Sequence, residues 1–131
     1  MAHERVYYHV VFNVTRGKPA LLLEEIDMAF KDAVCAIAQQ QGWMLMELET
    51  MPNHVHLLLR KRPQDDLSQI VGYLKGHTAH MLLERFPWLR GDLDSYHFWG
   101  RSFHYTRHTD ESLPTIRAYI RNQRRAGGLT E

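Results

Sequence analysis

Hydrophobic and polar positions alternate along several short stretches of the chain, and this period of two is typical of strands in a half-buried sheet. The clearest case is the run from Trp43 to Thr50, where Met44 and Met46 alternate with Glu47 and Glu49. The pattern, together with enrichment in β-branched and aromatic residues, predicts four strands. They cover Tyr7–Val14, Trp43–Thr50, His54–Arg60 and Phe98–Tyr105. The turn signal Met51-Pro52-Asn53 indicates that the middle two form a hairpin.

Apolar residues at helical spacing predict three helices between these strands. The helices cover Glu24–Gln41, Leu67–Arg85 and Ser112–Arg125. Gly42 is well placed to end the first, and Asp66 to cap the second. The third opens at Ser112 and Pro114 and stops before Gly127-Gly128. The segment from Pro87 to Asp94 is predicted to be a loop.

The predicted order of strands and helices is β-α-β-β-α-β-α. This order favours an α+β fold with an antiparallel sheet of four to five strands and helices packed mainly on one face. The chain has no internal repeat, low-complexity run or linker. We therefore expect residues 1–131 to form a single domain.

Composition limits the classes of function. With 131 residues, 44% hydrophobic and 24% charged, the chain is long enough to bury a core. No apolar stretch approaches the roughly 20 residues that span a bilayer, and the start MAHERVYYHV lacks the apolar core of a signal peptide. The single cysteine, Cys35, excludes an intrachain disulfide and a CxxC metal site. We therefore expect a cytoplasmic protein without membrane contact.

The net charge of +1 is too small for a protein that coats nucleic acid through bulk charge. Basic residues nevertheless cluster at Arg60-Lys61-Arg62 and at Arg121, Arg124 and Arg125. Such clusters suit phosphate contacts, and they equally suit the C-terminal end of a helix dipole. The nine histidines are more unusual, because histidine supplies metal ligands and proton carriers.

His54 and His56 form a candidate metal site. On a strand they share one face, while Val55, Leu57 and Leu59 share the other. Same-face neighbours lie roughly 6.6 Å apart, so two imidazoles can lean onto one ion at metal–nitrogen distances of about 2.0–2.2 Å. The alternative is a pair of solvated or hydrogen-bonded histidines on an amphipathic strand.

Tyr119 and Gln123 form a candidate second half of that site. They are four residues apart on the last helix and therefore lie on one face. If this helix packs on the histidine side of the sheet, Gln123 could give a third ligand and Tyr119 could approach a bound phosphate. A phenol has a reference pKa of about 10, and a divalent cation would help it to attack. The alternative is a core tyrosine beside a solvated glutamine.

The segment MPNHVHLLL, centred on His54-Val55-His56, resembles the histidine–hydrophobic–histidine (HUH) motif of the single-tyrosine transposases of small bacterial insertion sequences, which are related to REP-associated tyrosine transposases. The resemblance is collinear over about Tyr7 to Arg125. Its other segments are Tyr8-His9-Val10-Val11-Phe12, Tyr73-Leu74-Lys75-Gly76, Phe98-Trp99-Gly100 and Ala118-Tyr119-Ile120-Arg121-Asn122-Gln123.

This resemblance implies a ferredoxin- or RRM-like HUH nuclease fold and a metal-dependent single-stranded DNA endonuclease and strand transferase. By the resemblance, Tyr119 would be the nucleophile and form a 5′-phosphotyrosine intermediate at hairpin-bearing ends. His54, His56 and Gln123 would hold Mg²⁺ or Mn²⁺, without a nucleotide cofactor. The expected partners are hairpin DNA and a second copy of the chain in a homodimer. Candidate DNA contacts are Lys75, Arg101, Arg107, Arg121 and Arg124.

One segment departs from the family pattern. Family members usually have a glycine before the nucleophile helix, where the connecting arm flexes, and Thr106–Glu111 contains none. This leaves open whether Tyr119 serves its own histidine pair or that of a partner. His104 and His108 lie near this arm and could contact phosphate or simply be surface residues.

Two alternatives remain. One is a domesticated, non-catalytic nucleic-acid-binding domain. The other is a histidine-triad nucleotide hydrolase, which would need a third histidine where Leu58 stands.

Overall fold

The computed structural model describes residues 5–126. Four strands form one sheet: β1 (Val6–Val14), β2 (Met44–Met51), β3 (His54–Arg60) and β4 (Trp99–Thr109). The α-helices are α1 (Glu24–Gln41), α2 (Leu67–Arg85), α3 (Leu89–Leu93), α4 (Leu113–Arg121) and α5 (Gln123–Ala126). Two short 3₁₀ helices, η1 (Thr15–Gly17) and η2 (Ala20–Leu22), connect β1 to α1.

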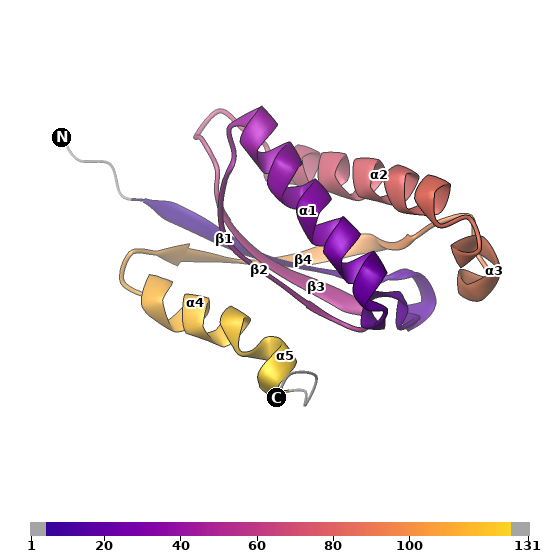
Figure 1. Cartoon of the computed structure of the whole chain (residues 1–131). Helices are drawn as coiled ribbons and strands as arrows, with labels where there is room; N and C mark the ends of the chain where they lie inside the picture. The colour runs from indigo at the N-terminus through magenta and orange to yellow at the C-terminus, as the bar shows by residue number, and fades with distance from the viewer. Residues whose placement is uncertain (1–4, 127–131) are drawn as a thin grey trace.

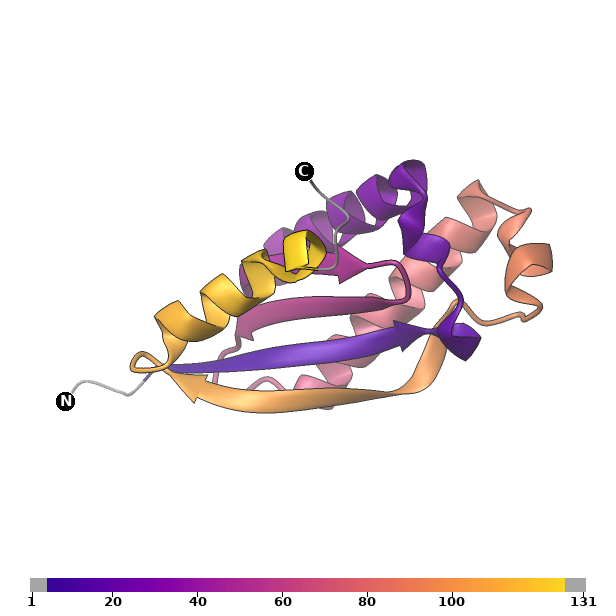
Figure 2. The ribbon, with the colours of Figure 1, turned by 90° about the horizontal axis from the view of Figure 1, so that it is seen from below.

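The strands are arranged in the order β2-β3-β1-β4, and every neighbouring pair is antiparallel (Figure 2). β2 and β3 form the predicted hairpin, with Met51 opposite His54. β1 lies in the middle, where Val11 is opposite both His56 of β3 and His104 of β4. The central place of β1 matters for function, because its side chains lie beside the histidine strand.

One face of the sheet carries the main core, beneath α1 and α2 (Figure 1). Alternation sends Val55, Leu57 and Leu59 of β3 to this face, where they pack with Phe12 of β1 and Phe30 of α1. Burying large apolar side chains contributes about 1.5–3 kcal/mol each. The core therefore explains the hydrophobic positions that alternate with the histidines.

The opposite face is covered by α4, which Figure 1 shows on the other side of the sheet from α1 and α2. A smaller core forms there from Ile116 and Ile120 of α4 with Tyr7 of β1 and Leu58 of β3. The predicted α+β fold, with helices mainly on one face, is thus confirmed. The last helix packs on the side to which alternation sends His54 and His56.

Apart from shifts of one residue at several ends, the structure differs from the sequence prediction in three features. α3 forms within the predicted loop, because Leu89 and Leu93, four residues apart, are both buried. β4 extends past Tyr105 to Thr109, since Thr109 still pairs with Val6. The last helix is broken at Asn122 into α4 and α5. Gly127 and Gly128, predicted to follow its end, lie outside the described residues.

The predicted helix ends at Asp66 and Gly42 are confirmed. The Asp66 carboxylate accepts a hydrogen bond from the Gln69 backbone N–H at 3.2 Å, and Gly42 takes a left-handed conformation at φ 76°. Within the described part of the chain, no helix combines the length and the apolar character that crossing a membrane requires.

Candidate metal and tyrosine site

The two histidines of β3 converge. His54 Nε2 lies 3.1 Å from His56 Nε2, and the His56 side chain is almost fully buried. Each imidazole uses its other nitrogen as well: His54 Nδ1 lies 2.7 Å from Asn53 Oδ1, and His56 Nδ1 lies 2.9 Å from His9 Nε2. The four side chains therefore form a chain of contacts that runs from the β2–β3 turn to the middle of β1.

Burial keeps these imidazoles neutral. Burial first, and then the neighbouring charges of His54 and His9, lower the pKa of His56 to about 4. Burial also lowers the pKa of His54, and burial with the charge of His108 lowers the pKa of His9. A neutral imidazole has a lone pair for a metal ion, so this pair is available as ligands at neutral pH.

Tyr119 of α4 lies next to the histidines of its own chain. Its ring centroid is 6.0 Å from that of His56 and 6.0 Å from that of His9. The residue is 52% exposed although it lies beside two partly or almost fully buried histidines. A concavity of about 370 Å³ opens beside it, lined by His9, His108, Ser112, Thr115, Ile116 and Tyr119.

Ion pairs hold α4 against β2. Arg117 Nε donates to Glu47 at 2.7 Å, and Arg121 donates to the same carboxylate at 2.9 Å. Burial alone would raise the pKa of Glu47, but hydrogen bonds and charges from Arg121 and Arg117 hold it below its usual value. In addition, Arg124 donates to the backbone carbonyl and hydroxyl of Thr50, at 2.6 and 2.8 Å. These contacts fix where Tyr119 stands.

Gln123 lies one turn beyond Tyr119, as predicted, and its amide nitrogen donates to the Tyr119 carbonyl at 3.3 Å. The amide nitrogen of Gln123, at the start of α5, is thus engaged with the backbone of α4. No group of three or more His, Cys, Asp or Glu side chains is placed to hold a metal ion within residues 5–126.

His9 is a residue of this site to which the sequence motifs give no role. It lies on β1, two residues from Tyr7, and so shares the face that α4 covers. Its register partner on β3 is Leu58, next to His56 on that face. The sequence does contain a signal, because His9 occurs at a central position of a strand that otherwise consists mainly of valine and aromatic residues. What was missing was the pairing of β1 with β3.

Four of the five residues predicted to contact DNA lie in two places, and the fifth, Lys75, lies on α2. Arg121 and Arg124 lie on the α4 face and are engaged with Glu47 and Thr50. Arg101 and Arg107 are exposed on β4, and Arg107 lines a concavity of about 410 Å³. The basic side chains of that concavity are Arg5, Arg60, Lys61 and Arg107.

Lys75 is tied to the protein backbone. Its ammonium donates to the carbonyls of Gly100 at 2.6 Å and Ser102 at 3.2 Å, and burial lowers its pKa. This side chain thus joins α2 to the start of β4.

The connection before α4 is short and anchored. The hydroxyl of Tyr7 donates to the Asp110 carboxylate at 2.7 Å, and the Ser112 backbone N–H donates to the carbonyl of Thr109 at 3.2 Å. His108 reaches Thr106 and Ser112 through its two ring nitrogens, whereas His104 is exposed. The first four residues of the segment without glycine, Thr106–Thr109, therefore belong to β4, and the chain then turns over residues 110–112 and returns across its own sheet.

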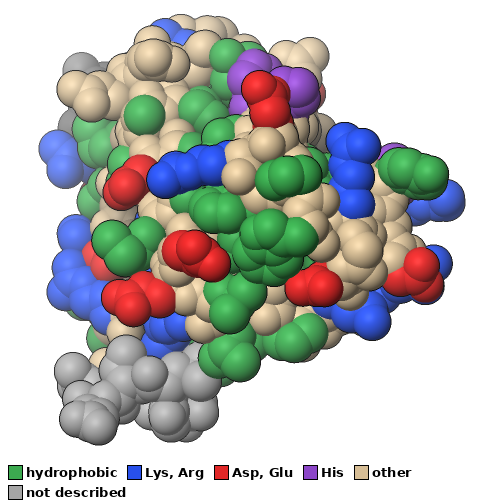
Figure 3. Space-filling model, turned by 45° about the vertical axis from the view of Figure 1, so that its right-hand side comes forward, with side chains coloured by type: hydrophobic (Ala, Val, Ile, Leu, Met, Phe, Trp, Pro, Cys, Tyr) green, Lys and Arg blue, Asp and Glu red, His purple; other side chains and the backbone are tan. Residues whose placement is uncertain are grey.

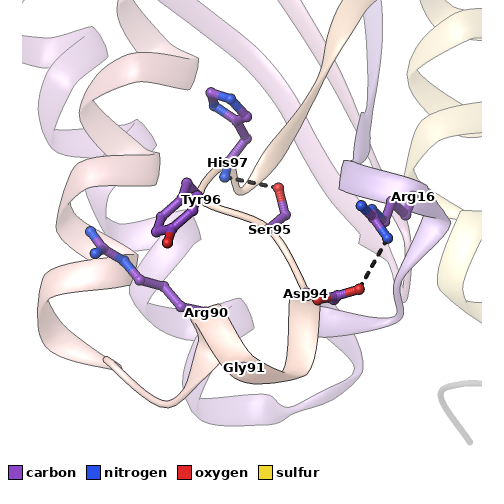
Figure 4. Close-up of a pocket in the computed structure, with 7 residues that line it drawn as sticks. All are labelled: Arg16, Arg90, Gly91, Asp94, Ser95, Tyr96 and His97. Carbon is purple, nitrogen blue, oxygen red and sulfur yellow. Dashed lines mark hydrogen bonds and ion pairs between the residues drawn. The ribbon is translucent and has the colours of Figure 1, made fainter.

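Two other hollows lie apart from the histidines. One of about 560 Å³ is lined by α3 and the segments beside it, where Arg16 pairs with Asp94 at 3.2 Å (Figure 4). The other, of about 400 Å³, has apolar side chains of η2 and α3 among its lining residues. Figure 3, which brings the α3 side forward, shows hydrophobic side chains gathered on this side with charged groups around them. Neither hollow includes a residue of the histidine–tyrosine site.

A paired-histidine strand and a tyrosine-bearing helix lie on one face of an antiparallel sheet, an arrangement that agrees with the family of transposases that the sequence resembles. Residues 2–123 match the family model described as "Transposase IS200 like", and the chain belongs to this family of transposases. It is therefore a DNA-cleaving enzyme by family.

Two curated relatives of the chain are transposases as well. The chain is similar to the ISDra2 transposase TnpA of Deinococcus radiodurans, with 31% identity over 116 residues, which cover 88% of this chain and 82% of the relative. It is also similar to the transposase for insertion sequence element IS200 of Salmonella typhimurium, with 29% identity over 125 residues, covering 94% and 81%.

Solved structures agree on the fold. A crystal structure described as that of a transposase from Deinococcus radiodurans superposes with a TM-score of 0.75 at 30% identity, covering 94% of this chain and 93% of the other. A REP-associated tyrosine transposase bound to a REP hairpin has a TM-score of 0.71 at 13% identity, covering 99% and 73%. The second likeness bears on the fold alone.

Proposed function

We propose that this transposase is a metal-dependent enzyme that cleaves and rejoins single-stranded DNA through a covalent link to Tyr119. The observation that carries the proposal is the convergence of three side chains. The Nε2 atoms of His54 and His56 lie 3.1 Å apart, and the Tyr119 ring lies 6.0 Å from the His56 ring in the same chain.

The residues present fit a divalent cation. Two nitrogens bound to one metal at about 2.0–2.2 Å can be no more than roughly 4.4 Å apart, and the Nε2 atoms satisfy this limit. The lowered pKa values keep both rings neutral, as ligands must be. We expect His54 and His56 to hold Mg²⁺ or Mn²⁺, with the Gln123 amide oxygen as a third ligand after rotation away from the Tyr119 carbonyl. When bound, the cation would neutralise charge on a DNA phosphate.

Tyr119 is the nucleophile in this proposal. Its hydroxyl oxygen attacks the phosphorus and loses its proton to solvent. The bond from phosphorus to the 3′-oxygen breaks, and that oxygen takes up a proton to become a free 3′-hydroxyl. The DNA 5′ end is left as a phosphotyrosine ester. Attack by another 3′-hydroxyl reverses these steps and joins strands, so no nucleotide cofactor is needed.

The substrate we propose is single-stranded DNA beside a hairpin. The concavity lined by Arg5, Arg60, Lys61 and Arg107 offers positive charge for backbone phosphates. Arg101 is exposed on the same strand as Arg107 and could extend this surface. We give Arg121, Arg124 and Lys75 a smaller role, because their cationic groups are already engaged within the chain.

We further propose a homodimer in which each Tyr119 serves its own histidine pair. β2 and β4 are the outer strands of the sheet, and an outer strand presents backbone groups to a second chain. Within one chain, the tight turn before α4 and the Glu47 ion pairs already bring Tyr119 to His56.

The test of the nucleophile uses Tyr119→Phe with hairpin-bearing single-stranded DNA and Mn²⁺. The parent should give a protein–DNA adduct on a denaturing gel, and Tyr119→Phe should bind the DNA but give none. His56→Ala should lose metal-dependent cleavage. An adduct formed by Tyr119→Phe would overturn the nucleophile assignment, and full cleavage by His56→Ala would remove the metal site.

Mixing these two variants tests which chain supplies the tyrosine. In a mixed dimer, a tyrosine that serves its own histidines leaves both sites inactive. A tyrosine exchanged between chains would instead create one complete site. We expect no recovery of cleavage on mixing, and recovery would contradict the arrangement within one chain.

A further inference from the structure

A third histidine, His9 on β1, contacts the ring nitrogen of His56 that does not face His54. No sequence motif assigns a role to His9. In the structure, however, its Nε2 lies 2.9 Å from His56 Nδ1. The two rings are nearly parallel, with 16° between their planes and 5.2 Å between their centroids. His9 thus lies directly behind a proposed metal ligand, on the side away from His54.

The contacts on either side of the pair restrict where protons can sit. A neutral imidazole carries one N–H, on Nδ1 or on Nε2. The side chain of Asn53 presents its carbonyl oxygen to His54 Nδ1 at 2.7 Å, so the proton of His54 belongs on Nδ1. His54 Nε2 is then a bare lone pair that faces His56 Nε2.

Two proton arrangements satisfy this chain of contacts. Without a cation, His56 Nε2–H donates to His54 Nε2, which leaves His56 Nδ1 bare to accept from His9 Nε2–H. With a cation between the two Nε2 atoms, neither can carry a proton. The proton of His56 must then sit on Nδ1 and donate to His9 Nε2, and the proton of His9 must move to Nδ1.

We infer that His9 is a positioning residue that orients His56 by changing from hydrogen-bond donor to acceptor when the cation binds. This inference rests on the proposed function, because it requires a cation at His54 and His56. Metal-bound histidines commonly donate their second N–H to a carboxylate, a carbonyl or water, and these partners affect affinity by about 10–100-fold. A carboxylate side chain at position 9 could accept a hydrogen bond from His56 but could not donate one to it.

The arrangement gives the two ligands different partners. Asn53 lies at the β2–β3 turn and accepts from His54 in both arrangements, so it need not change. His9 is half-buried on the central strand beneath α4 and must change. His54 therefore serves as an internal reference, because its protonated nitrogen should stay the same when the protonated nitrogen of His56 changes.

The first experiment follows the tautomers directly. Protein labelled with ¹⁵N-histidine, carrying Tyr119→Phe to prevent cleavage and bound to hairpin-bearing single-stranded DNA, is examined by long-range ¹H–¹⁵N NMR before and after addition of Mg²⁺. We expect the protonated nitrogen of both His9 and His56 to change from Nε2 to Nδ1, while His54 stays protonated on Nδ1.

A second experiment compares Mn²⁺ affinity by electron paramagnetic resonance of the free ion, in the same Tyr119→Phe background and with the same DNA. His9→Phe keeps a ring but cannot accept, and we expect its Mn²⁺ affinity to fall about 10–100-fold. The His9→Gln side chain can rotate to donate or accept, so we expect it to stay within about threefold of the parent. Circular dichroism melting confirms that each variant is folded.

The outcomes separate this inference from the proposed function. If Mg²⁺ changes the signals of His54 and His56 but His9 keeps its proton on Nε2, the inference is wrong and the metal site stands. Equal Mn²⁺ affinities of the parent and His9→Phe would also overturn the inference. If no histidine responds to Mg²⁺ and the parent binds no Mn²⁺, the metal site itself is wrong. Should His9→Phe fail to fold, the NMR experiment and His9→Gln still decide.

Discussion

The attachment of α4 to the sheet should depend strongly on Glu47. Only Ile116 and Ile120 of this helix are buried, so its apolar contact with the sheet is small. The Glu47 side chain is 10% exposed and accepts from Arg117 at 2.7 Å and from Arg121 at 2.9 Å. Replacing it with glutamine keeps the shape but removes the charge that both arginines face.

The size of the effect follows from these contacts. A hydrogen bond to a charged group contributes about 1.5–3 kcal/mol. Water reaches the outer part of the Arg121 side chain, so we take the lower half of this range, about 1.5–2 kcal/mol, for loss of the Glu47 charge. Since about 1.4 kcal/mol corresponds to a factor of ten, α4 should open roughly 10–30 times more often in Glu47→Gln.

Hydrogen exchange measured by mass spectrometry gives this opening directly. Amides of Leu113–Arg121 should exchange faster by that factor in Glu47→Gln, while those of α1 and α2 should not change. Glu49→Gln is the matched control, because Glu49 stands on the same strand but pairs with Lys31 of α1 at 3.0 Å. Unchanged exchange in α4, or an equal increase throughout the chain, would refute the role given to Glu47.

Three further predictions concern stability. Because the pKa of His56 is about 4 in the folded chain and about 6.5 when unfolded, the unfolded state binds more protons between these values. The free energy of unfolding of the metal-free protein, measured by urea unfolding, should therefore fall by roughly 2–3 kcal/mol as the pH falls from 6.5 to 4. In His56→Gln the free energy of unfolding should depend less on pH over that range. In the parent, the buried indole N–H of Trp99 donates to the Thr78 hydroxyl at 2.9 Å. Thr78→Val removes this acceptor and should lower the free energy of unfolding in urea by about 1–3 kcal/mol, whereas Thr78→Ser keeps the hydroxyl and should lower it less. Asp66→Ala removes the cap of α2 and should lower stability by about 0.5–2 kcal/mol, whereas Asp66→Asn should retain most of it.

Much of the fold could be predicted because local signals agree with tertiary packing. On β3, Val55 and Leu57 alternate with the two histidines, and the helix ends at Asp66 and Gly42 are where the sequence predicted them. α3 could not be predicted, because its residues include Gly91 and Asp92, which are typical of loops. Its helical form depends on Leu89 and Leu93 reaching a core made by distant segments.

The candidate site could be predicted only in part. Spacing along one strand suffices to place His54 beside His56, and spacing along one helix to place Tyr119 beside Gln123. The role of His9 depends on the antiparallel register between β1 and β3, which no local pattern contains. Likewise, nothing in the basic clusters indicated that Arg121 would be engaged by Glu47, 74 residues away along the chain.

The proposed metal and tyrosine site is tested most directly by the position of a bound Mn²⁺ relative to the tyrosine. Crystals of Tyr119→Phe with hairpin-bearing single-stranded DNA and Mn²⁺ would give an anomalous signal at the manganese edge. We predict one strong peak within about 2.0–2.3 Å of Nε2 of both His54 and His56, with a DNA phosphate between that peak and the substituted aromatic ring on α4 of the same chain. A peak bound by other residues, or a phosphate that only the α4 ring of another chain can reach, would contradict it.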